Sequence, residues 1–297
     1  MPTPSSAGGQ MVVGYDGSAA SQRALVWAAA VSHALGDGLR IIHAIDLDVV
    51  RRRRGSAPRP LSPSLEMVAE TMVGGPSTWP GRPLARSQVR AVHAFGGPVG
   101  ELVDASMTAD LIVLGTRGLG RTRSALIGSV SSAVAARAYS PVVVLHDLGH
   151  SPPGARRDVP VPGPGCEVVC ALTPGTGEAH ANRMERIVSA AARIAAGCSA
   201  RLRLVTVLSP DAAGPSDRTE PPTSPYAVAT LGLTHPDLAV ATQTLYGDPV
   251  EALTGTSRDC GLLVIGAPHR GGVGTVLVGT APYRIIHDAS CPVMLVH

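Results

Sequence analysis

The segment LIVLGTRG at residues 111–118 has a counterpart in LLVIGAPH at residues 262–269. A second pair, SPVVVLH at 140–146 and CPVMLVH at 291–297, is separated by the same distance along the chain. Self-similarity that keeps one register over half of a chain is typical of a duplicated structural unit. The sequence therefore predicts two copies of one fold in tandem.

Each copy alternates strand-like and helix-like patterns, which is typical of a parallel sheet covered by helices. The first copy has β-branched apolar runs that suit strands buried on both faces, at roughly residues 10–15, 39–45, 88–94, 110–115 and 141–146. Its first helix is expected to begin at Asp16 or Ser18 and to end at Gly36. Further helices are expected at residues 98–107 and 129–138 and, with a weaker pattern, near 64–73. We therefore predict an α/β fold with two tandem open parallel five-stranded sheets and flanking helices.

A segment rich in Pro and Gly, GHSPPGARRDVPVPGPG at residues 149–165, separates the two copies. Its composition indicates a linker, so we predict domains at residues 1–148 and 166–297. In the second copy the first helix is expected at about residues 178–196. The Pro- and Ser-rich stretch at 211–225 predicts a loop where the first copy has its weak helix.

The composition excludes several classes of protein. Of the 297 residues, 44% are hydrophobic and 16% are charged, so a packed globular protein is expected. A net charge of +3 and an aromatic content of 3% predict no nucleic-acid partner. All 25 basic residues are Arg, which excludes chemistry based on a Schiff-base lysine or a P-loop lysine.

The cysteines and the N-terminal segment indicate the compartment. The five cysteines have no C-x-x-C spacing, and four of them lie in apolar or Ala-rich stretches, which favours a reducing environment. We interpret Cys166 and Cys170, both on an expected strand, as packing residues rather than a redox pair. The first residues, MPTPSSAGGQ, do not resemble a signal peptide, and no apolar run is long enough to span a membrane. We expect a soluble, cytoplasmic protein with no membrane partner.

Glycines follow the first and fourth expected strands. In an open parallel sheet, ligands bind beyond the carboxyl ends of the strands, where the strand order reverses. The segment YDGS at residues 15–18 should there meet GTRG at residues 115–118. Nine residues separate Gly118 from the pair Gly128-Ser129, which opens a helix, so the loop has the pattern G-x2-G-x9-G-S/T.

This spacing suits a phosphate. Gly115 and Gly118 lack a Cβ atom, which allows a ligand to approach the backbone closely. The N–H groups at the start of the following helix, from Gly128 to Val130, favour an anion, and Arg117, Arg121 and Arg123 add positive charge nearby. Asp16 would face a hydroxyl, an adenine amino group or a magnesium ion across the crevice.

Taken together, the GYDGS start, the ADLIVLG strand, the glycine pattern and the SPVVVLH ending resemble the universal stress protein family in its tandem form. The resemblance covers nearly all of both copies except the linker and two long loops. It implies a five-stranded parallel α/β domain that is Rossmann-like (adenine-nucleotide alpha-hydrolase-like), dimerisation through the last strand, and ATP binding in one subgroup. The final strands would then pair within the chain, or between two chains of a homodimer.

The resemblance also implies a set of ATP contacts, with or without Mg²⁺. Transferred to matching positions, the set is Asp16, Gly115, Gly118, Gly128 and Ser129. The charge of Arg117 and the N–H groups of Val130 and Ser131 at the helix start add these three residues to the candidate site. Ala44, at the end of the second strand, is a looser candidate for an adenine contact. No catalytic or metal-ligating residue is assigned.

The second copy departs from the pattern at three positions. His269 replaces the second glycine, Leu172 or Thr173 replaces Asp16, and Pro282 replaces Ser131, which removes an N–H donor from the helix start. We expect this copy to bind ATP weakly, to bind another anion, or only to complete the fold.

Three functions are compatible with these residues. The first is an ATP-binding regulator, the second an enzyme in the same crevice, and the third an interaction module without ligand. The chain has no G-x-S-x-G elbow and no H-x-G-H motif, so an enzyme would be limited to slow ATP hydrolysis. Other readings stay open for single features: the glycine loop could be an ordinary turn, Asp16 a helix cap, and the arginines at 51–54 a solvated run or a docking segment. His43 and His93 lack the spacing of a metal site.

Overall fold

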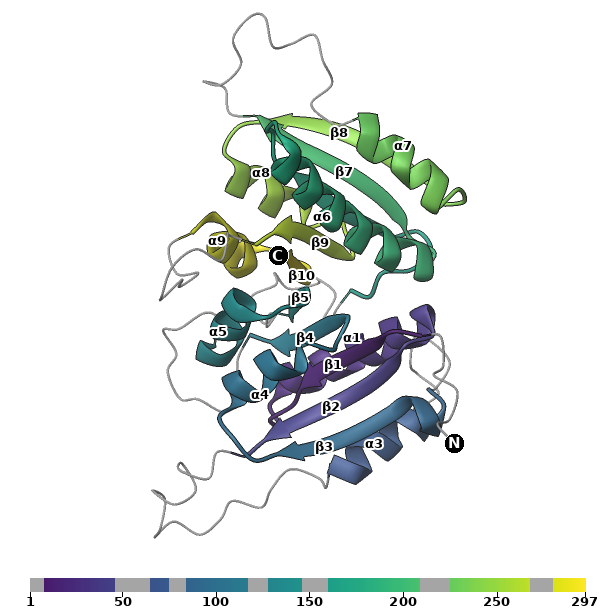
Figure 1. The fold of residues 1–297 in the computed structure, drawn as a ribbon, viewed down its shortest axis with the longest axis vertical. Coiled ribbons are helices and arrows are strands. Elements are labelled where there is room, and N and C mark those ends of the chain that lie inside the picture. Colours follow the sequence, from purple (N-terminus) through teal and green to yellow (C-terminus); the bar gives the residue numbers. More distant parts are fainter. Residues whose placement is uncertain are drawn as a thin grey trace, which may run out of the picture.

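The computed structural model describes residues 8–45, 65–74, 84–116, 128–145, 160–208, 225–267 and 280–297. Its strands form one ten-stranded sheet in the order β3-β2-β1-β4-β5-β10-β9-β6-β7-β8 (Figure 1). The two halves have the same strand order, with the second reversed. The α/β prediction is confirmed, but the two expected sheets are continuous with each other.

In the first half the elements are β1 (Gln10–Gly14), α1 (Ala19–Leu35), β2 (Gly38–Ala44), α3 (Leu65–Gly74), the short 3-10 helix η1 (Arg86–Gln88), β3 (Val89–Ala94), α4 (Pro98–Ala105), β4 (Leu111–Gly115), α5 (Ser129–Arg137) and β5 (Val142–Leu145). In the second half they are β6 (Glu167–Leu172), α6 (Glu178–Gly197), β7 (Arg201–Leu208), α7 (Pro225–Thr234), β8 (Val240–Tyr246), α8 (Pro249–Thr256), β9 (Leu262–Gly266), α9 (Ala281–Asp288) and β10 (Val293–Val296). Within each half neighbouring strands are parallel.

The halves join through their final strands. β5 and β10 are antiparallel, with Met294 opposite Val143 and Val293 opposite Val144. Of the two pairings that the sequence left open, the structure has the one within the chain. The sheet edges are β3 and β8 instead, and both are half exposed rather than fully apolar. The two apolar final strands, β5 and β10, therefore lie inside the sheet and are buried. An exposed, unpaired apolar edge would favour aggregation.

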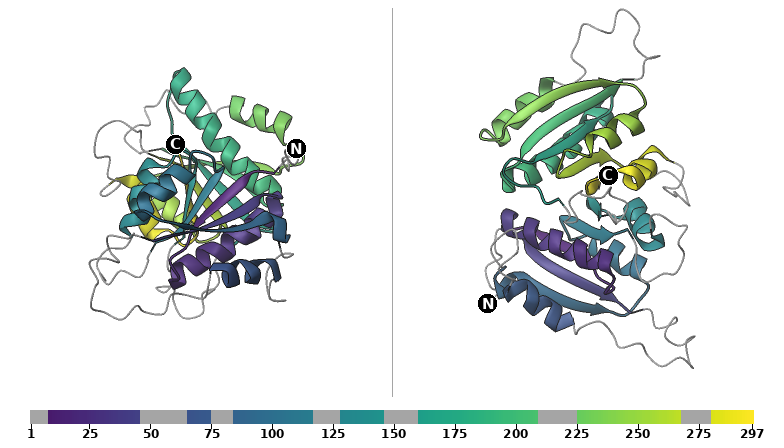
Figure 2. Two further views of the ribbon diagram at one scale, coloured as in Figure 1. Left: turned by 60° about the horizontal axis from the view of Figure 1, so that its bottom comes forward. Right: turned by 180° about the vertical axis from the view of Figure 1, so that it is seen from behind.

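Helices cover both faces of the sheet (Figure 2). One core contains buried residues of α1, α3, α6 and α7, and the other contains buried residues of α4, α5, α8 and α9. Both cores run across the seam between the halves, because Val143 and Met294 belong to the first core and Val144 and Val293 to the second. The two halves therefore share their hydrophobic layers.

Helix α1 begins and ends where the sequence predicts. The Ser18 side chain caps it by accepting a hydrogen bond from the N–H of Ser21 at 3.2 Å. Gly36 closes it in the left-handed conformation, with φ of 71°, where a residue without Cβ is favoured. Between these ends Ala24, Trp27 and Ala28 are fully buried. The two alanines allow the helix to lie close to the sheet, and Trp27 fills the larger space in the core.

Helix α7 corrects one expectation. The Pro- and Ser-rich stretch was expected to leave a loop between the second and third strands of the second half, yet residues 225–234 form a helix there. The sequence PYAVATLGLT begins with Pro, which is tolerated in the first turn of a helix. Leu231 is buried in the core that contains α6. The Pro- and Ser-rich stretch therefore ends where the helix begins, at Pro225, and does not replace the helix.

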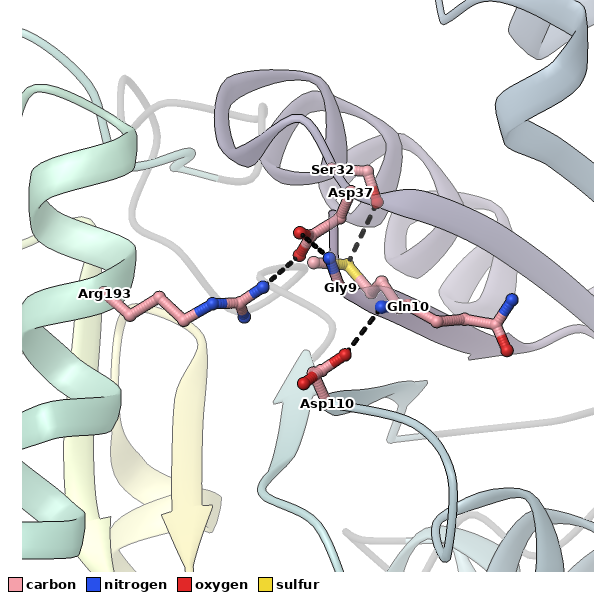
Figure 3. A network of polar contacts seen from close by, with 7 residues as sticks. Gly9, Gln10, Ser32, Asp37, Asp110 and Arg193 are labelled. Carbon is pink, nitrogen blue, oxygen red and sulfur yellow. Dashed lines mark hydrogen bonds and ion pairs between the residues drawn. The ribbon is translucent and has the colours of Figure 1, made fainter. Parts of the chain in front are cut away.

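A buried carboxylate links the first helices of the two halves (Figure 3). Asp37, which is 2% exposed, accepts a hydrogen bond from the N–H of Gly9 at 2.9 Å through Oδ1. Its Oδ2 lies 2.6 Å from Nη2 of Arg193, which comes from α6. Asp110 accepts from the N–H of Gln10 next to this pair. Both oxygens of the buried carboxylate thus have a donor, and one donor comes from the other half.

The cysteines lie where packing residues are expected. Cys170, Cys198, Cys260 and Cys291 are buried, and Cys166 is half buried. Burial raises the pKa of Cys170 and of Cys198 to about 12, so neither thiol ionises near neutral pH. In the ranges that the structure describes, no helix has the length and apolar character of a membrane span.

Candidate functional site

The turn between β1 and α1 holds Asp16 at the carboxyl end of the sheet. Asp16 Oδ1 accepts a hydrogen bond from the N–H of Ser18 at 3.0 Å, and Gly17 has φ of 79°. The Asp16 N–H lies 3.4 Å from the Ser21 hydroxyl. This carboxylate therefore supports the entry to α1, while Ser18 is the capping residue. Asp16 is half buried.

Gly115 ends β4 directly beneath the first turn of α1. A Cβ atom on Gly115 would lie 2.6 Å from the carbonyl carbon and oxygen of Ala20 and 2.8 Å from its Cβ. Such distances are too short for any side chain, because the backbone of α1 would have to move. The missing side chain is thus required by packing inside the protein, a reason that differs from the ligand approach expected from the sequence.

Helix α5 begins next to the same strand end. The N–H of its N-cap residue, Gly128, donates to the carbonyl of Thr116, and a Cβ on Gly128 would lie 2.7 Å from that oxygen. The Ser131 hydroxyl donates to the carbonyl of Gly115 at 2.6 Å. These two bonds hold the start of α5 against the end of β4.

No side chain of the described residues caps α5 at its N-terminus. The N–H groups of the first three residues of an α-helix have no acceptor within the helix, and here they belong to Ser129, Val130 and Ser131. Ser129 is exposed and Val130 is half buried. The helix end therefore presents backbone donors next to β4, as the sequence predicts.

Ala44 and a histidine pair lie on the neighbouring strands. Ala44 is the last residue of β2 and is paired in register with Ala94 of β3. Nδ1 of His43 lies 2.7 Å from the Tyr15 carbonyl oxygen, so Nδ1 carries the proton in this bond. The rings of His43 and His93 meet edge to face, with centroids 5.8 Å apart. Among the described residues, no group of three or more His, Cys, Asp or Glu is arranged to hold a metal ion.

The structure brings most of the predicted set together at one end of the first half. Asp16, Gly115, Gly128, Ser129, Val130 and Ser131 lie on three adjoining segments: the β1–α1 turn, the end of β4 and the start of α5. Arg117, Gly118, Arg121 and Arg123 lie outside the described residues, as do the arginines at 51–54 and His269.

Gly115→Ala should destabilise the protein whether or not a ligand is bound. The added methyl group would overlap the backbone of Ala20, and overpacking of this kind costs about 1–3 kcal/mol. Urea unfolding followed by circular dichroism measures the loss. Gly100→Ala is the control, since a Cβ at Gly100 in α4 meets nothing within 4 Å. Equal stabilities of the two variants would contradict this packing role.

The equivalent place in the second half is closed by an arginine. In the sheet register Val168 corresponds to Met11 and Gly266 to Gly115, yet Gly266 lies beneath Arg183 instead of an alanine. A Cβ on Gly266 would be 2.9 Å from Cδ1 of Ile187 and 3.1 Å from Nη2 of Arg183. The same Nη2 donates to the carbonyl of Ala267. The Arg183 side chain therefore spans from α6 to the end of β9.

The helix that follows β9 also differs from its counterpart. Thr280 is the N-cap of α9 and accepts from the N–H of Tyr283 at 3.4 Å, and Pro282 has no N–H to offer. The first turn of α5 presents three backbone N–H donors. In α9 the Tyr283 N–H is already bound by the Thr280 cap, and the donor at Pro282 is missing. Both differences reduce the room and the donors available for an anion in the second half.

The chain matches one family model over most of its length. A model described as the universal stress protein family matches residues 9–146 and 181–297. The chain belongs to the universal stress protein family. Universal stress protein Rv2005c of Mycobacterium tuberculosis is 26% identical to it over 309 residues, which cover 96% of each chain.

A solved structure of similar length has the same fold as this universal stress protein. The crystal structure of a universal stress protein from Archaeoglobus fulgidus DSM 4304 superposes with a TM-score of 0.65 and 18% identity, and it covers 97% of this chain and 96% of its own. A universal stress protein solved in complex with cAMP covers 48% of this chain and 99% of its own, at 25% identity and a TM-score of 0.35.

Sequence reasoning missed Arg183 as a residue of the second crevice. One signal was available, because Arg183, which is half buried, precedes the buried Ile187 and Ala191 by one and two helical turns and so lies in line with the buried stripe of α6. An arginine in a buried stripe needs an acceptor, and the nearby carbonyl of Ala267 is that acceptor.

Proposed function

We propose that this universal stress protein binds ATP in its first half and acts as a nucleotide-dependent regulator in a stress response. One observation carries the proposal: the uncapped start of α5 adjoins the end of β4, and the Asp16 turn lies over the same strand end. Backbone donors at a helix N-terminus suit phosphate groups. A carboxylate on the neighbouring strand suits the sugar or the base of a nucleotide.

Magnesium would enter with the nucleotide. Asp16 is the one carboxylate among the proposed contacts, and it already accepts from the N–H of Ser18 through one oxygen. A single carboxylate, together with phosphate oxygens and water, is a common way to bind Mg²⁺. When bound, the ion would neutralise phosphate charge, and the protein would contribute Asp16.

We propose that the second half does not bind adenine nucleotide. Arg183 occupies the space above Gly266, and α9 is capped by its own Thr280. The expected binding stoichiometry is thus one nucleotide per chain.

Self-association of the chain would use a surface other than β5 and β10, because these strands already pair with each other.

A ligand-free interaction module is the second candidate. It is favoured by the finding that Gly115 and Gly128 are explained by contacts with Ala20 and Thr116, so these two glycines do not by themselves require a ligand. The two candidates differ in one measurable property, which is the affinity for ATP.

Asp16→Asn should weaken ATP binding at least about tenfold, the loss expected when an interaction of about 1.4 kcal/mol is removed. Asparagine keeps a side-chain oxygen for the Ser18 N–H, so the turn should remain folded. Isothermal titration calorimetry with ATP and Mg²⁺ measures the change. Thr173→Val, at the corresponding turn of the second half, should leave the affinity unchanged. Absence of ATP binding by the wild type would favour the ligand-free module.

A further inference from the structure

Arg203 shows how an arginine at one position of this sheet is neutralised. It lies on β7, opposite Val169 of β6 and Ala241 of β8. Its Nε lies 2.9 Å from Oε2 of Glu167, and its Nη1 donates to Oε1 of Gln243 at 2.8 Å. Both partners come from the strands on either side, so the guanidinium is balanced within the protein.

Arg40 occupies the corresponding position in the first half without these partners. It lies on β2, opposite Val12 of β1 and Arg90 of β3. In the shared register Gln10 takes the place of Glu167, and Val92 takes the place of Gln243. At these positions the first half therefore lacks the carboxylate of Glu167 and the amide of Gln243, which bind Arg203 in the second half.

A second arginine, Arg90, lies at the same place in the first half. Arg90 stands where the second half has Ala241, directly opposite Arg40 in the strand register. Within the described part of the chain, Nε of Arg40 is buried without a hydrogen-bond partner. Nε of Arg203 also makes no hydrogen bond there, but it lies 2.9 Å from the carboxylate of Glu167. Neither arginine forms an ion pair with a carboxylate of the described residues. Like charges that face each other across two strands destabilise a sheet.

The surroundings of this pair are poor in compensating groups. Burial, together with the charge of Arg90, lowers the pKa of Arg40. Arg40 and Ile42 alternate with Leu39 and Ile41, so Arg40 projects to the face that α4 covers in part. Both arginines lie near the amino ends of their strands, whereas Gly115 lies at the carboxyl end of β4 and Asp16 follows the carboxyl end of β1. The pair is therefore separate from the proposed nucleotide site and does not depend on it.

We infer that Arg40 and Arg90 form an anion-binding site for a phosphate group on the open face of β2 and β3. Two guanidinium groups supply planar sets of N–H donors that match the oxygens of a phosphate. A phosphate dianion also balances both positive charges, which a single carboxylate would not. The same chemistry is offered by free inorganic phosphate and by a phosphate ester.

The test follows the arginine side chains by NMR. The Nε–H resonance of Arg40 should shift and saturate when the full-length protein is titrated with inorganic phosphate, or with O-phosphoserine as the ester. Saturation by phosphate identifies a free phosphate as sufficient, and saturation by O-phosphoserine alone identifies an ester. In Arg90→Ala, which restores the residue type of the second half, the affinity should fall at least tenfold. The Arg203 resonance is the internal control and should not move.

A second variant separates binding from folding. Gln10→Glu with Val92→Gln and Arg90→Ala transfers the complete partner set of Arg203 to Arg40. It should keep the fold, remove the phosphate response of Arg40 and leave ATP binding unchanged. The inference is overturned if the Arg40 resonance does not respond in the wild type, if it responds equally in Arg90→Ala, or if Arg203 responds as strongly as Arg40.

Discussion

Met294→Asp should destabilise the protein by more than about 4 kcal/mol, which is a large part of the total stability of an ordinary domain. Met294 is 1% exposed and lies at the centre of β10, between Val143 of β5 and Val264 of β9. A carboxylate at this position would be buried without a partner among apolar side chains, and that burial is costly. The effect should be seen in urea unfolding monitored by circular dichroism, and as loss of soluble protein.

Met294→Leu is the matched control, because a swap that conserves volume in a core costs less than about 1.5 kcal/mol.

A chain that ends at Ser290 provides a second test of the pairing between β5 and β10. It lacks β10 and leaves apolar edges on β5 and β9, so it should aggregate or change its oligomeric state on size-exclusion chromatography. Unchanged elution of the truncated chain would show that the halves do not depend on this pairing.

Arg193→Ala should lower the free energy of unfolding by about 3 kcal/mol. Its partner Asp37 is almost fully buried, and removing one member of such a pair leaves a charge without compensation in the interior. The Gly9 N–H would be the one donor of the described network that still binds the carboxylate. Because the ion pair joins the turn after α1 to α6, the two halves of the Arg193→Ala variant should also unfold less cooperatively.

Arg86→Ala is the control, because it removes an ion pair that is exposed instead of buried. Arg86 and Glu70 are 3.7 Å apart and both are largely exposed, so their contribution should be below about 1 kcal/mol. If Arg193→Ala cost no more than Arg86→Ala, the buried contact between the halves would not contribute to stability.

The regular elements could be predicted from the sequence because their patterns are local. The strands are continuous apolar runs, and the observed bounds, such as Leu111–Gly115 and Val142–Leu145, differ from the expected 110–115 and 141–146 by at most one residue at either end. The repeat predicted the equal strand order of the halves. Helix α7 was missed because Pro225, read as part of a breaker run, is its first residue.

Contacts between distant segments could not be predicted. Asp37 lies between two glycines, as an ordinary turn residue would, and its partner Arg193 is 156 residues away. Nothing local in the sequence indicates that this carboxylate is buried. The pairing of β5 with β10 was predicted only as one of two alternatives, since the same apolar edge could have paired with another chain.

The candidate site shows what a motif can and cannot predict. The glycine pattern correctly located the end of β4 and the start of α5, which the structure brings together. It did not predict that Gly115 is needed beneath Ala20, because a motif does not distinguish a ligand from the protein's own backbone as the nearby group. Arg183 was overlooked because it lies outside the motif, on α6.

The central claim is one ATP site per chain, located in the first half. Native mass spectrometry after incubation with ATP and Mg²⁺ tests it most directly, because it counts nucleotides on each chain. We predict at most one bound adenine nucleotide per chain, with equal occupancy on the wild type and on Thr173→Val and a much lower occupancy on Asp16→Asn at the same ATP concentration. No nucleotide on the wild type, or two per chain, would contradict the account.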